Sequence, residues 1–333
     1  MSGKIHIHHG DGGKYTNQLI HDIFYKTFNT PLIDRGRDGA VLDLPYGKIA
    51  YTTDSFVVNP IFFPGGDIGK LAVCGTINDL AVSGASPLYL SLAMIIEEGF
   101  EIDPLQKIVS SIEESCSLQG VRIVTGDTKV VERGSMDGIF INTSGIGSIM
   151  NDYEEKGIEP GDEVIVTGGI GEHGIAIALE RYDLNLSGKI QSDCGSVYPI
   201  VKKLEDDLPY IKLMKDPTRG GITSVLNEIA QKSEIGVELI EEYIPISNQV
   251  RGISSLLGID PLYLACEGRM ILIVKEGKGN QVVEKIRQVD IGKDAVIIGK
   301  VVSIEEKCVY MKTKIGGRRI LHMLESPMLP RIC

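Results

Sequence analysis

The chain lacks any closely spaced pair of cysteines. Its six cysteines, at positions 74, 116, 194, 266, 308 and 333, form no Cys-x-x-Cys motif, so we expect neither a structural zinc site nor a thioredoxin-like centre. A chain of 333 residues can bury its own hydrophobic cores and does not depend on disulfides for stability. We therefore expect reduced thiols and a cytoplasmic location.

Long apolar runs and an excess of positive charge are also missing. The most apolar stretch, Pro87–Ile96, is too short to cross a bilayer, which takes about 20 residues, and we expect no signal peptide because the first residues contain no apolar core. The net charge of −11 argues against nonspecific nucleic-acid binding, which relies on Lys and Arg. No Gly-x-x-x-x-Gly-Lys-Ser/Thr sequence occurs, which excludes a P-loop. We expect neither membranes nor nucleic acids as partners.

The first half of the chain has the pattern of a compact α+β unit. Apolar and alternating stretches predict strands at 40–42, 48–58, 87–96, 121–125 and 138–149, with a Pro45-Tyr46-Gly47 turn joining the first two. Helical spacing predicts helices at 18–28, 67–83 and 104–119, the last of them ended by Gly120. The strands 48–58 and 87–96 carry more apolar side chains than two helices can cover, so we expect a homodimer held by this domain.

The second half predicts an α/β domain that begins after a polar boundary at 150–157. Its expected strands are 163–167, 211–214, 237–240, 270–274, 296–302 and 308–312, and its expected helices are 175–181, 197–206, 222–233, 248–257 and 280–288. We therefore divide the chain into a flexible glycine-rich segment (1–37), a first domain (38–152), a second domain (153–320) and a mobile tail (321–333).

The tail ends in a cysteine, Cys333. Pro327 and Pro330 disfavour both a helix and a central strand, so an extended and mobile arm is expected. A simple frayed terminus is the alternative, because chain ends are often disordered. The choice between a functional and an incidental thiol depends on the rest of the chain.

Several aspartates stand where an unpaired charge would be costly. Asp54 lies inside an apolar strand, Asp79 lies inside an apolar helix, Asp127 follows a strand end, and Asp38 precedes the first strand. Each one alone fits a helix cap or a solvated edge. Carboxylates that converge from several elements instead favour Mg²⁺ carrying nucleotide phosphates, and we predict this site.

Two glycine motifs join strands to helices in the second half. The run Asp216-Pro-Thr-Arg-Gly220-Gly221 is suited to bind an anion at a helix N-terminus. The run Gly168–Gly174, which contains His173, is explained equally well by a tight turn. Glu267 stands at the entry of a predicted buried strand, where a surface turn is the simpler interpretation. Near the start, Gly10–Lys14 suits either a loop over phosphates or a flexible loop, and histidines 6, 8 and 9 are weaker candidates for a metal site.

These residues together resemble a known superfamily. Thr53-Asp54, Asn78-Asp79, Gly126-Asp127 and Asp216-Pro-Thr-Arg-Gly-Gly are similar to motifs of the ATP-binding superfamily of aminoimidazole ribonucleotide synthetase, selenophosphate synthetase and thiamine-monophosphate kinase. The terminal Pro-Arg-Ile-Cys, the early Asp-Gly-Gly and the Gly-Glu-His-Gly run narrow the resemblance to the HypE family of hydrogenase maturation factors. The resemblance covers essentially the whole chain.

The resemblance implies a two-domain fold and a reaction. The first domains of two copies would share a β-barrel, with two ATP sites at the dimer interface. The carbamoyltransferase HypF would load a carbamoyl group onto Cys333, ATP-dependent dehydration would leave a thiocyanate, and the HypC–HypD scaffold would receive cyanide for a [NiFe] hydrogenase. By similarity, magnesium and phosphates would be held by Asp38, Asp54, Asp79 and Asp127, while Lys129 would neutralise charge, Glu267 would act as base and His173 would assist.

Two other functions remain open from the sequence. One is a different ATP-dependent phosphoryl-transfer enzyme of the same superfamily. Selenophosphate synthetase would need a reactive Cys or selenocysteine in the N-terminal glycine region, which here holds none. A passive carrier that displays a modified Cys333 is the other alternative, and phosphate release from ATP distinguishes it.

Overall fold

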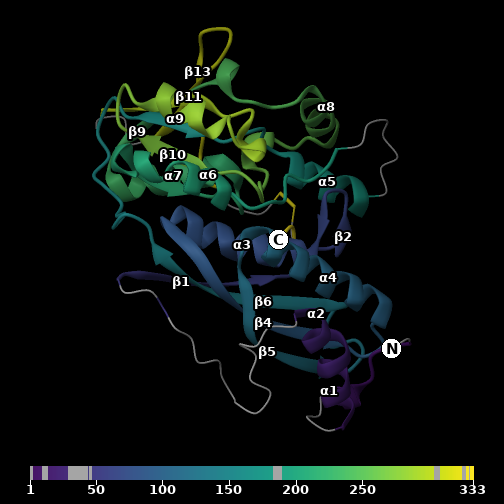
Figure 1. The fold of residues 1–333 in the computed structure, drawn as a ribbon. Helices are drawn as coiled ribbons and strands as arrows, with labels where there is room; N and C mark the ends of the chain where they lie inside the picture. Colours follow the sequence, from purple (N-terminus) through teal and green to yellow (C-terminus); the bar gives the residue numbers. More distant parts are fainter. Residues whose placement is uncertain are drawn as a thin grey trace.

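A computed structural model describes residues 3–9, 14–28, 44, 47–182, 190–303, 308–324, 328, 329 and 331–333. These residues form two domains stacked on either side of helix α3 (Ile68–Val82), and the end of the chain lies between the domains (Figure 1). The two-domain α+β and α/β architecture predicted from the sequence is confirmed. No helix in the described part of the chain is long and apolar enough to cross a membrane.

The first domain is a four-stranded sheet covered on one face by two helices. The strand order is β1-β6-β4-β5, and only the β4–β5 pair is parallel. A short pair, β2 with β3, leads into α3. The elements are β1 (Ile49–Phe56), β2 (Phe62–Phe63), β3 (Gly66–Asp67), α3 (Ile68–Val82), β4 (Ala85–Glu97), α4 (Ile102–Gln119), β5 (Arg122–Val131) and β6 (Ile139–Ile149).

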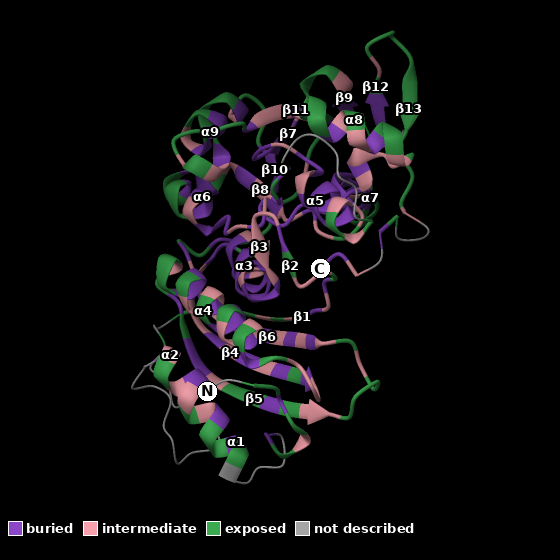
Figure 2. Ribbon diagram, turned by 90° about the vertical axis from the view of Figure 1, so that its right-hand side faces the viewer, coloured by how far each residue is buried: buried purple, intermediate pink, exposed green. Residues whose placement is uncertain are grey.

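Helix α3 connects the two domains. Asp67 caps it, because its side chain accepts hydrogen bonds from the backbone of Gly69 at 2.7 Å and Lys70 at 3.1 Å. Twelve of its fifteen residues are buried, as expected for a helix that is apolar all round. It packs on its own sheet and also on β8 (Ile211–Lys215) and α6 (Tyr198–Lys203) of the second domain. Figure 2 shows it almost entirely buried. Side chains on α3 can therefore serve a site between the domains.

The second domain is a seven-stranded mixed sheet of order β13-β12-β9-β11-β7-β10-β8. Apolar residues of one face pack with α7, and those of the other face pack with α6 and α9. The strands are β7 (Glu163–Val166), β8 (Ile211–Lys215), β9 (Gly236–Ile240), β10 (Ile271–Val274), β11 (Val296–Val302), β12 (Val309–Lys312) and β13 (Arg318–Ile320). The helices are α5 (Glu172–Arg181), α6 (Tyr198–Lys203), α7 (Gly221–Ser233), α8 (Asn248–Leu257) and α9 (Gly279–Ile286), with short 3₁₀ turns at Glu205–Tyr210, Glu241–Tyr243, Pro261–Tyr263 and Asp290–Gly292.

The segment predicted to be flexible, 1–37, is folded over much of its described part. A 3₁₀ turn (Ile7–His9) is followed by α1 (Lys14–Leu19), one π-helical stretch (Ile20–Tyr25) and α2 (Lys26–Phe28). Leu19, Ile23 and Phe28 are buried in the core beside α4. The helix predicted at 18–28 is confirmed, because its apolar face outweighs the polar composition around it, and the flexibility expected for 1–37 does not extend to these residues. The predicted strand 40–42 and Asp38 lie outside the described residues.

The tail lies against the body of the protein in this structure. Ile332 and Leu329 are buried, and Cys333 is half-buried beside the end of β1. The expected extended arm is therefore seen in one docked position, and its mobility stays a prediction.

Candidate active site

A cavity of about 590 Å³ lies where the tail meets both domains. Its wall is formed by the end of β1, helix α3, the turn before α7, the segment before β10 and the tail itself. The structure thus brings residues predicted from five separate stretches of sequence to one cavity: Asp54, Asp79, Asp216, Gly220, Glu267 and Cys333.

Three aspartates crowd negative charge into this cavity. Burial raises the pKa of the Asp54 and Asp79 carboxyls, and the Asp54 charge raises that of Asp79 further. Burial, followed by the charge of Asp79, raises the pKa of Asp216 to about 7. Thr52 Oγ1 donates to Asp79 Oδ2 at 2.7 Å, which fixes one carboxylate oxygen. Carboxylates that disfavour their own charge in this way fit a site for a cation.

The donor chemistry fits magnesium bound together with phosphates. Within the described residues, no group of three or more His, Cys, Asp and Glu side chains is arranged to hold a metal ion by itself. Mg²⁺ commonly binds one or two carboxylates and completes its shell with water and substrate phosphates. The hard oxygen donors Asp54, Asp79 and Asp216 match that mode of binding.

The start of α7 provides the opposite charge. Gly221 has φ of +59°, and a Cβ there would lie 2.6 Å from the carbonyl oxygens of Leu262 and Leu264, so a side chain would be strained and would clash. The turn places Gly220 and Arg219 at the cavity wall, and the positive end of the helix dipole favours an anion there.

Glu267 is a buried carboxylate aimed at the cavity. Its residue is 2% exposed, and its Oε1 has no hydrogen-bond partner among the described residues. Burial, followed by the charges of Asp193 and Asp216, raises its pKa well above the usual range. A carboxyl group with a raised pKa and an unused oxygen is suited to take and hold a proton.

Asn78 fixes the backbone around Glu267 from the first domain. Its Nδ2 donates to Gly195 O at 3.1 Å and to Glu267 O at 3.3 Å, while its Oδ1 accepts from Val197 N at 2.8 Å. Asn78 was expected only as part of the Asn78-Asp79 motif, with no role of its own. A buried amide in an apolar helix requires partners, and that signal pointed to it.

Cys333 faces the same carboxylates. Burial raises the pKa of its thiol, and the charges of Glu267, Asp54 and Asp216 add to this, while Arg219 opposes it. The docked cysteine is therefore neutral. A site that favours a neutral sulfur suits a thioester-like substituent better than a thiolate.

His173 contacts the tail backbone. Its Nε2 donates to the carbonyl oxygen of Ile332 at 2.7 Å, and its Nδ1 lies 2.8 Å from Ser192 Oγ. Both ring nitrogens are thus engaged with protein atoms, so the ring holds the tail in place rather than facing the cavity.

Asp127 and Lys129 do not reach this cavity within the chain. Asp127 lies inside β5, not beyond a strand end as predicted, and the two side chains pair with each other at 3.1 Å with 60% and 64% of their surfaces exposed. Asp127 pairs across the sheet with Ala93, whose neighbours Leu92 and Met94 are buried under the helices. Because side chains alternate along a strand, Asp127 points to the face opposite Asp54.

Sequence reasoning missed the groups that hold the tail and the base in position. Arg181, Ser192 and Asp193 stand in stretches with no unusual pattern. Arg181 and Asp193 contact residues more than 70 positions away in the sequence, and Ser192 contacts His173, which is 19 positions away. No local signal in the sequence identifies them.

Two domain families match the chain, one for each domain of the fold and in the same order along the sequence. The N-terminal domain of AIR synthase related proteins matches residues 36–149, and the C-terminal domain of the same proteins matches residues 159–311. The two matches lie on either side of the expected boundary and include the aspartates and Glu267.

Individual relatives match over nearly the full length. The carbamoyl dehydratase HypE of Azotobacter vinelandii is 42% identical over 334 residues, covering 100% of this chain and 98% of that protein. A crystal structure of the hydrogenase maturation protein HypE in complex with ATP is 43% identical, with a TM-score of 0.94, over 98% of this chain and 99% of that one. A crystal structure of a HypE–HypF complex is 44% identical, with a TM-score of 0.80, over 92% of this chain and 99% of that one.

Proposed function

Because this chain belongs to the HypE family of carbamoyl dehydratases, within the AIR synthase related proteins, we propose that it converts an S-carbamoyl group on Cys333 into a thiocyanate with the use of ATP. The observation that carries the proposal is the position of Cys333 in the same cavity wall as Asp54, Asp79, Asp216 and Glu267. The docked tail brings the substituted sulfur to the carboxylates, so the substrate is part of the chain.

The reaction balances as a dehydration driven by phosphoryl transfer. The carboxamide oxygen attacks the γ-phosphorus of ATP, ADP leaves, and the nitrogen gives up one proton to form an O-phosphorylated imidate. Loss of the second N–H proton then breaks the C–O bond, phosphate leaves, and the C≡N bond forms. The products are the protein thiocyanate, ADP and phosphate. Phosphorylation is needed because an amide oxygen is a poor leaving group.

The residues divide between proton transfer and phosphate binding. Glu267 takes one N–H proton, since its carboxyl has a raised pKa and an unused oxygen, and the departing phosphate carries away the other. Asp54 and Asp79 would hold Mg²⁺, with Asp216 in the same cavity wall, and the ion when bound would screen the charge of the phosphates. Arg219 and Gly220 line the cavity just before α7, and together with Gly221 at the start of the helix they would face the same phosphates. Asp38 keeps its proposed role as a ligand but lies outside the described residues.

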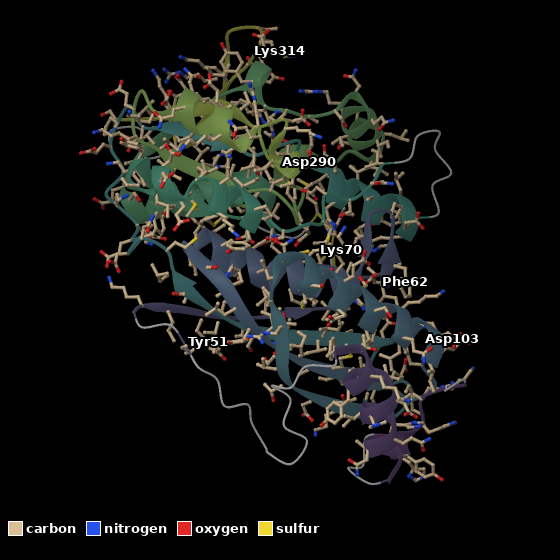
Figure 3. The ribbon with its side chains drawn as sticks, in the orientation of Figure 1. Tyr51, Phe62, Lys70, Asp103, Asp290 and Lys314 are labelled. Atoms are coloured by element: carbon tan, nitrogen blue, oxygen red, sulfur yellow. The ribbon has the colours of Figure 1, made fainter. Side chains whose placement is uncertain are left out.

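Lys129 and Asp127 enter this proposal only through a second copy of the chain. Both lie on the outward face of the sheet, at the opposite edge from β1. Ile49, Tyr51 and Ile95 are 48%, 66% and 44% exposed on that same face, and Figure 3 shows Tyr51 pointing away from the second domain. A homodimer that buries this face would bring β5 of one copy toward β1 of the other, with ATP sites at the interface.

The partners follow from the chemistry of the tail. A carbamoyltransferase must load Cys333, and the complex of a close relative with HypF supports that enzyme as the donor. The HypC–HypD scaffold would accept the cyanide for the iron of a [NiFe] hydrogenase, in the cytoplasm.

Single-turnover chemistry tests the proposal. Protein carbamoylated at Cys333 by its donor enzyme is mixed with Mg²⁺ and ATP, and phosphate release is followed together with intact mass. We expect one phosphate per chain and the loss of the mass of one water. Phosphate release that does not depend on carbamoylation would favour another phosphoryl-transfer enzyme of the superfamily. No release at all would favour a passive carrier.

A further inference from the structure

The last three residues are held through their backbone carbonyls. Arg331 O accepts from Arg181 Nη2 at 2.7 Å and from Asn59 N at 3.2 Å. Ile332 O accepts from His173 Nε2 at 2.7 Å, and Cys333 O accepts from Val57 N at 3.2 Å. Each carbonyl from 331 to 333 therefore has a partner on the body, and none of these bonds involves the sulfur.

The pairing has the register of an antiparallel ladder. Val57 is opposite Cys333 and Asn59 is opposite Arg331. The tail therefore pairs with the stretch of backbone that follows the end of β1. Arg331 strengthens it, because its Nε donates to Val57 O at 3.0 Å and its Nη1 pairs with Asp137 Oδ2 at 2.5 Å. The backbone pairing itself gives affinity without reading side chains, and the Arg331 side chain adds to it.

The hydrogen bonds of His173 fit a neutral ring that carries its proton on Nε2. A carbonyl oxygen only accepts, so Nε2 carries the proton. Ser192 Oγ accepts from Cys194 N at 3.0 Å and is then able to donate to Nδ1 at 2.8 Å. The imidazole is neutral and fully satisfied, in agreement with the pKa of the ring being lowered by burial.

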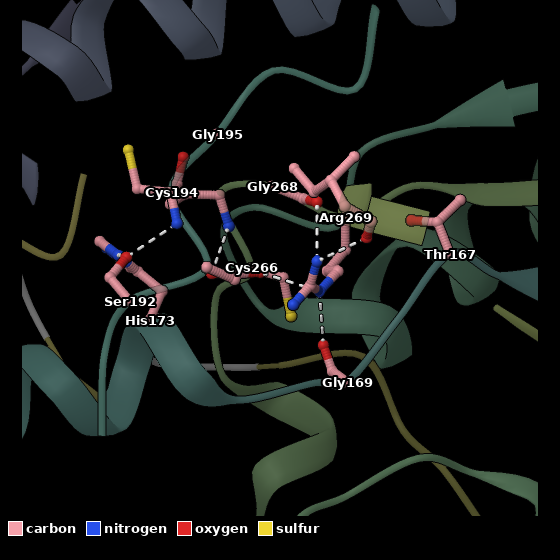
Figure 4. Close-up of polar contacts among 12 residues, drawn as sticks. Thr167, Gly169, His173, Ser192, Cys194, Gly195, Cys266, Gly268 and Arg269 are labelled. Atoms are coloured by element: carbon pink, nitrogen blue, oxygen red, sulfur yellow. Dashed lines mark hydrogen bonds and ion pairs between the residues drawn. The ribbon is translucent and has the colours of Figure 1, made fainter. Parts of the chain in front are cut away.

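The segment that orients His173 also touches the base. Ser192 N donates to Pro64 O at 2.8 Å, which anchors the segment to the first domain. Glu267 N donates to Asp193 Oδ1 at 3.2 Å, and Gly195 N donates to Glu267 O at 3.3 Å. Figure 4 shows Ser192, Cys194 and Gly195 following one another beside His173 and Arg269. The segment 192–195 thus supports both Glu267 and His173, and His173 in turn contacts the tail.

We propose that His173 and Arg181, with the backbone of Val57 and Asn59, form a tail latch that recognises the main chain of residues 331–333 and positions the substituent on Cys333 against Glu267. His173 and Arg181 are positioning residues, since they contact the tail backbone and not the reacting atoms. Because the latch does not bind the sulfur, it accepts the thiol, the thiocarbamate and the thiocyanate alike. The identity of the group carried on Cys333 rests on the proposed function, whereas the recognition of the tail backbone does not.

Alkylation of the thiol measures docking without ATP or a carbamoyl group. Purified full-length protein is treated with iodoacetamide, and the modification of Cys333 is compared by mass spectrometry with that of Cys308, which is also half-buried but lies outside the site. Docking slows the reaction, since burial raises the pKa of the Cys333 thiol. Failure of the proposed function leaves this readout unaffected.

Matched substitutions identify the hydrogen bond. His173→Gln keeps a donor near the position of Nε2 and should react like wild type. His173→Asn is shorter, loses the bond to Ile332 O, and should speed alkylation of Cys333 by roughly fivefold, the effect of one buried hydrogen bond. Cys308 should be unchanged in both variants. Equal Cys333 rates in wild type and His173→Asn would overturn the latch.

Arg181→Met provides an independent test if His173 variants fold poorly. It removes the donor to Arg331 O and should speed Cys333 alkylation by a similar factor. In carbamoylated protein the same variants should slow single-turnover phosphate release while the ATP concentration for half-saturation stays unchanged. A change in ATP affinity with no change in Cys333 alkylation would instead assign these residues to the nucleotide site and overturn the proposal.

Discussion

At the scale of single residues, the carboxylates of the cavity are held at a cost in the absence of a cation. Burial raises the pKa of both Asp54 and Asp79, so the fold alone does not stabilise their charges. Carboxylates whose pKa is strongly shifted by burial are characteristic of functional sites. Their surroundings were visible in the sequence, because each Asp interrupts an apolar run.

We expect Asp54→Asn and Asp79→Asn to abolish ATP turnover and to leave the fold intact. Loss of groups that only support metal ligands costs 10- to 100-fold, so loss of a ligand should cost at least about 100-fold. Without metal, thermal stability should be equal or higher, because the variants remove repelling charges. Phosphate release and thermal unfolding in a chelator measure the two effects. Asp290→Asn, which removes an exposed carboxylate, is the control, and normal turnover in either site variant would contradict the magnesium assignment.

The latch should depend on pH through His173. Burial lowers the pKa of the ring below its ordinary value of 6.5, and this outweighs the opposing effects of the Asp193 charge and of the hydrogen bond to the Ile332 carbonyl. A histidine that is kept neutral in the docked state contributes fully to the stability of docking when the pH is above its ordinary pKa. That contribution is lost as the pH falls below about 6.5. Cys333 alkylation, expressed as the ratio of wild type to His173→Gln at each pH, should therefore rise toward acid. A flat ratio between pH 5 and pH 8 would contradict it.

At the scale of elements, local pattern was sufficient for most strands and helices. The predicted strand 296–302 and helix 248–257 match β11 and α8 residue for residue, because alternation, helical period and glycine ends are local properties. Asp127 was misplaced for the same reason. The predicted strand ends at Thr125, whereas β5 continues to Val131 through its pairing with β4, and pairing is not local.

The N-terminal helices give a test at this scale. Leu19 is fully buried, so Leu19→Ala should lower the free energy of unfolding by about 2–5 kcal/mol. Leu118→Ala, at a side chain that is 75% exposed, should change it by less than about 0.5 kcal/mol. Denaturant unfolding of both variants gives the comparison. Equal stabilities would mean that the segment before the first domain is not part of the core.

At the scale of the whole molecule, the site depends on contacts that no single stretch of sequence contains. Asn78 from the first domain holds the backbone of Glu267 in the second domain, and the tail lies between the two domains. Sequence patterns and family resemblance identified the reacting groups, whereas the groups that orient them were found only in the assembled structure.

Light scattering tests the homodimer directly. An obligate interface would bury roughly 2,000 Å² or more, and the outward face of β1 and β4, with Ile49, Tyr51 and Ile95 exposed, is the surface we expect to be covered. We expect the mass of two chains at micromolar concentration. Tyr51→Glu, which places a charge on that face, should shift the protein toward the monomer, and a wild-type monomer would contradict the proposal.

Mixed dimers test whether Lys129 serves the site of the other copy. Cys333→Ala and Lys129→Ala chains should each be inactive alone, the first because it lacks the carrier and the second because it lacks a cation at the phosphates. In a mixed dimer, Cys333 of the Lys129→Ala chain can meet Lys129 of the Cys333→Ala chain. One site in each mixed dimer is then complete, so randomly paired chains should recover about a quarter of wild-type phosphate release. If Lys129 acted within its own chain, no mixed dimer would contain a complete site and the mixture would stay inactive. An inactive mixture, in a preparation that light scattering shows to be dimeric, would exclude a role for Lys129 in the site of the other copy. In that case every chain that carries Cys333 would lack the lysine that its own site needs.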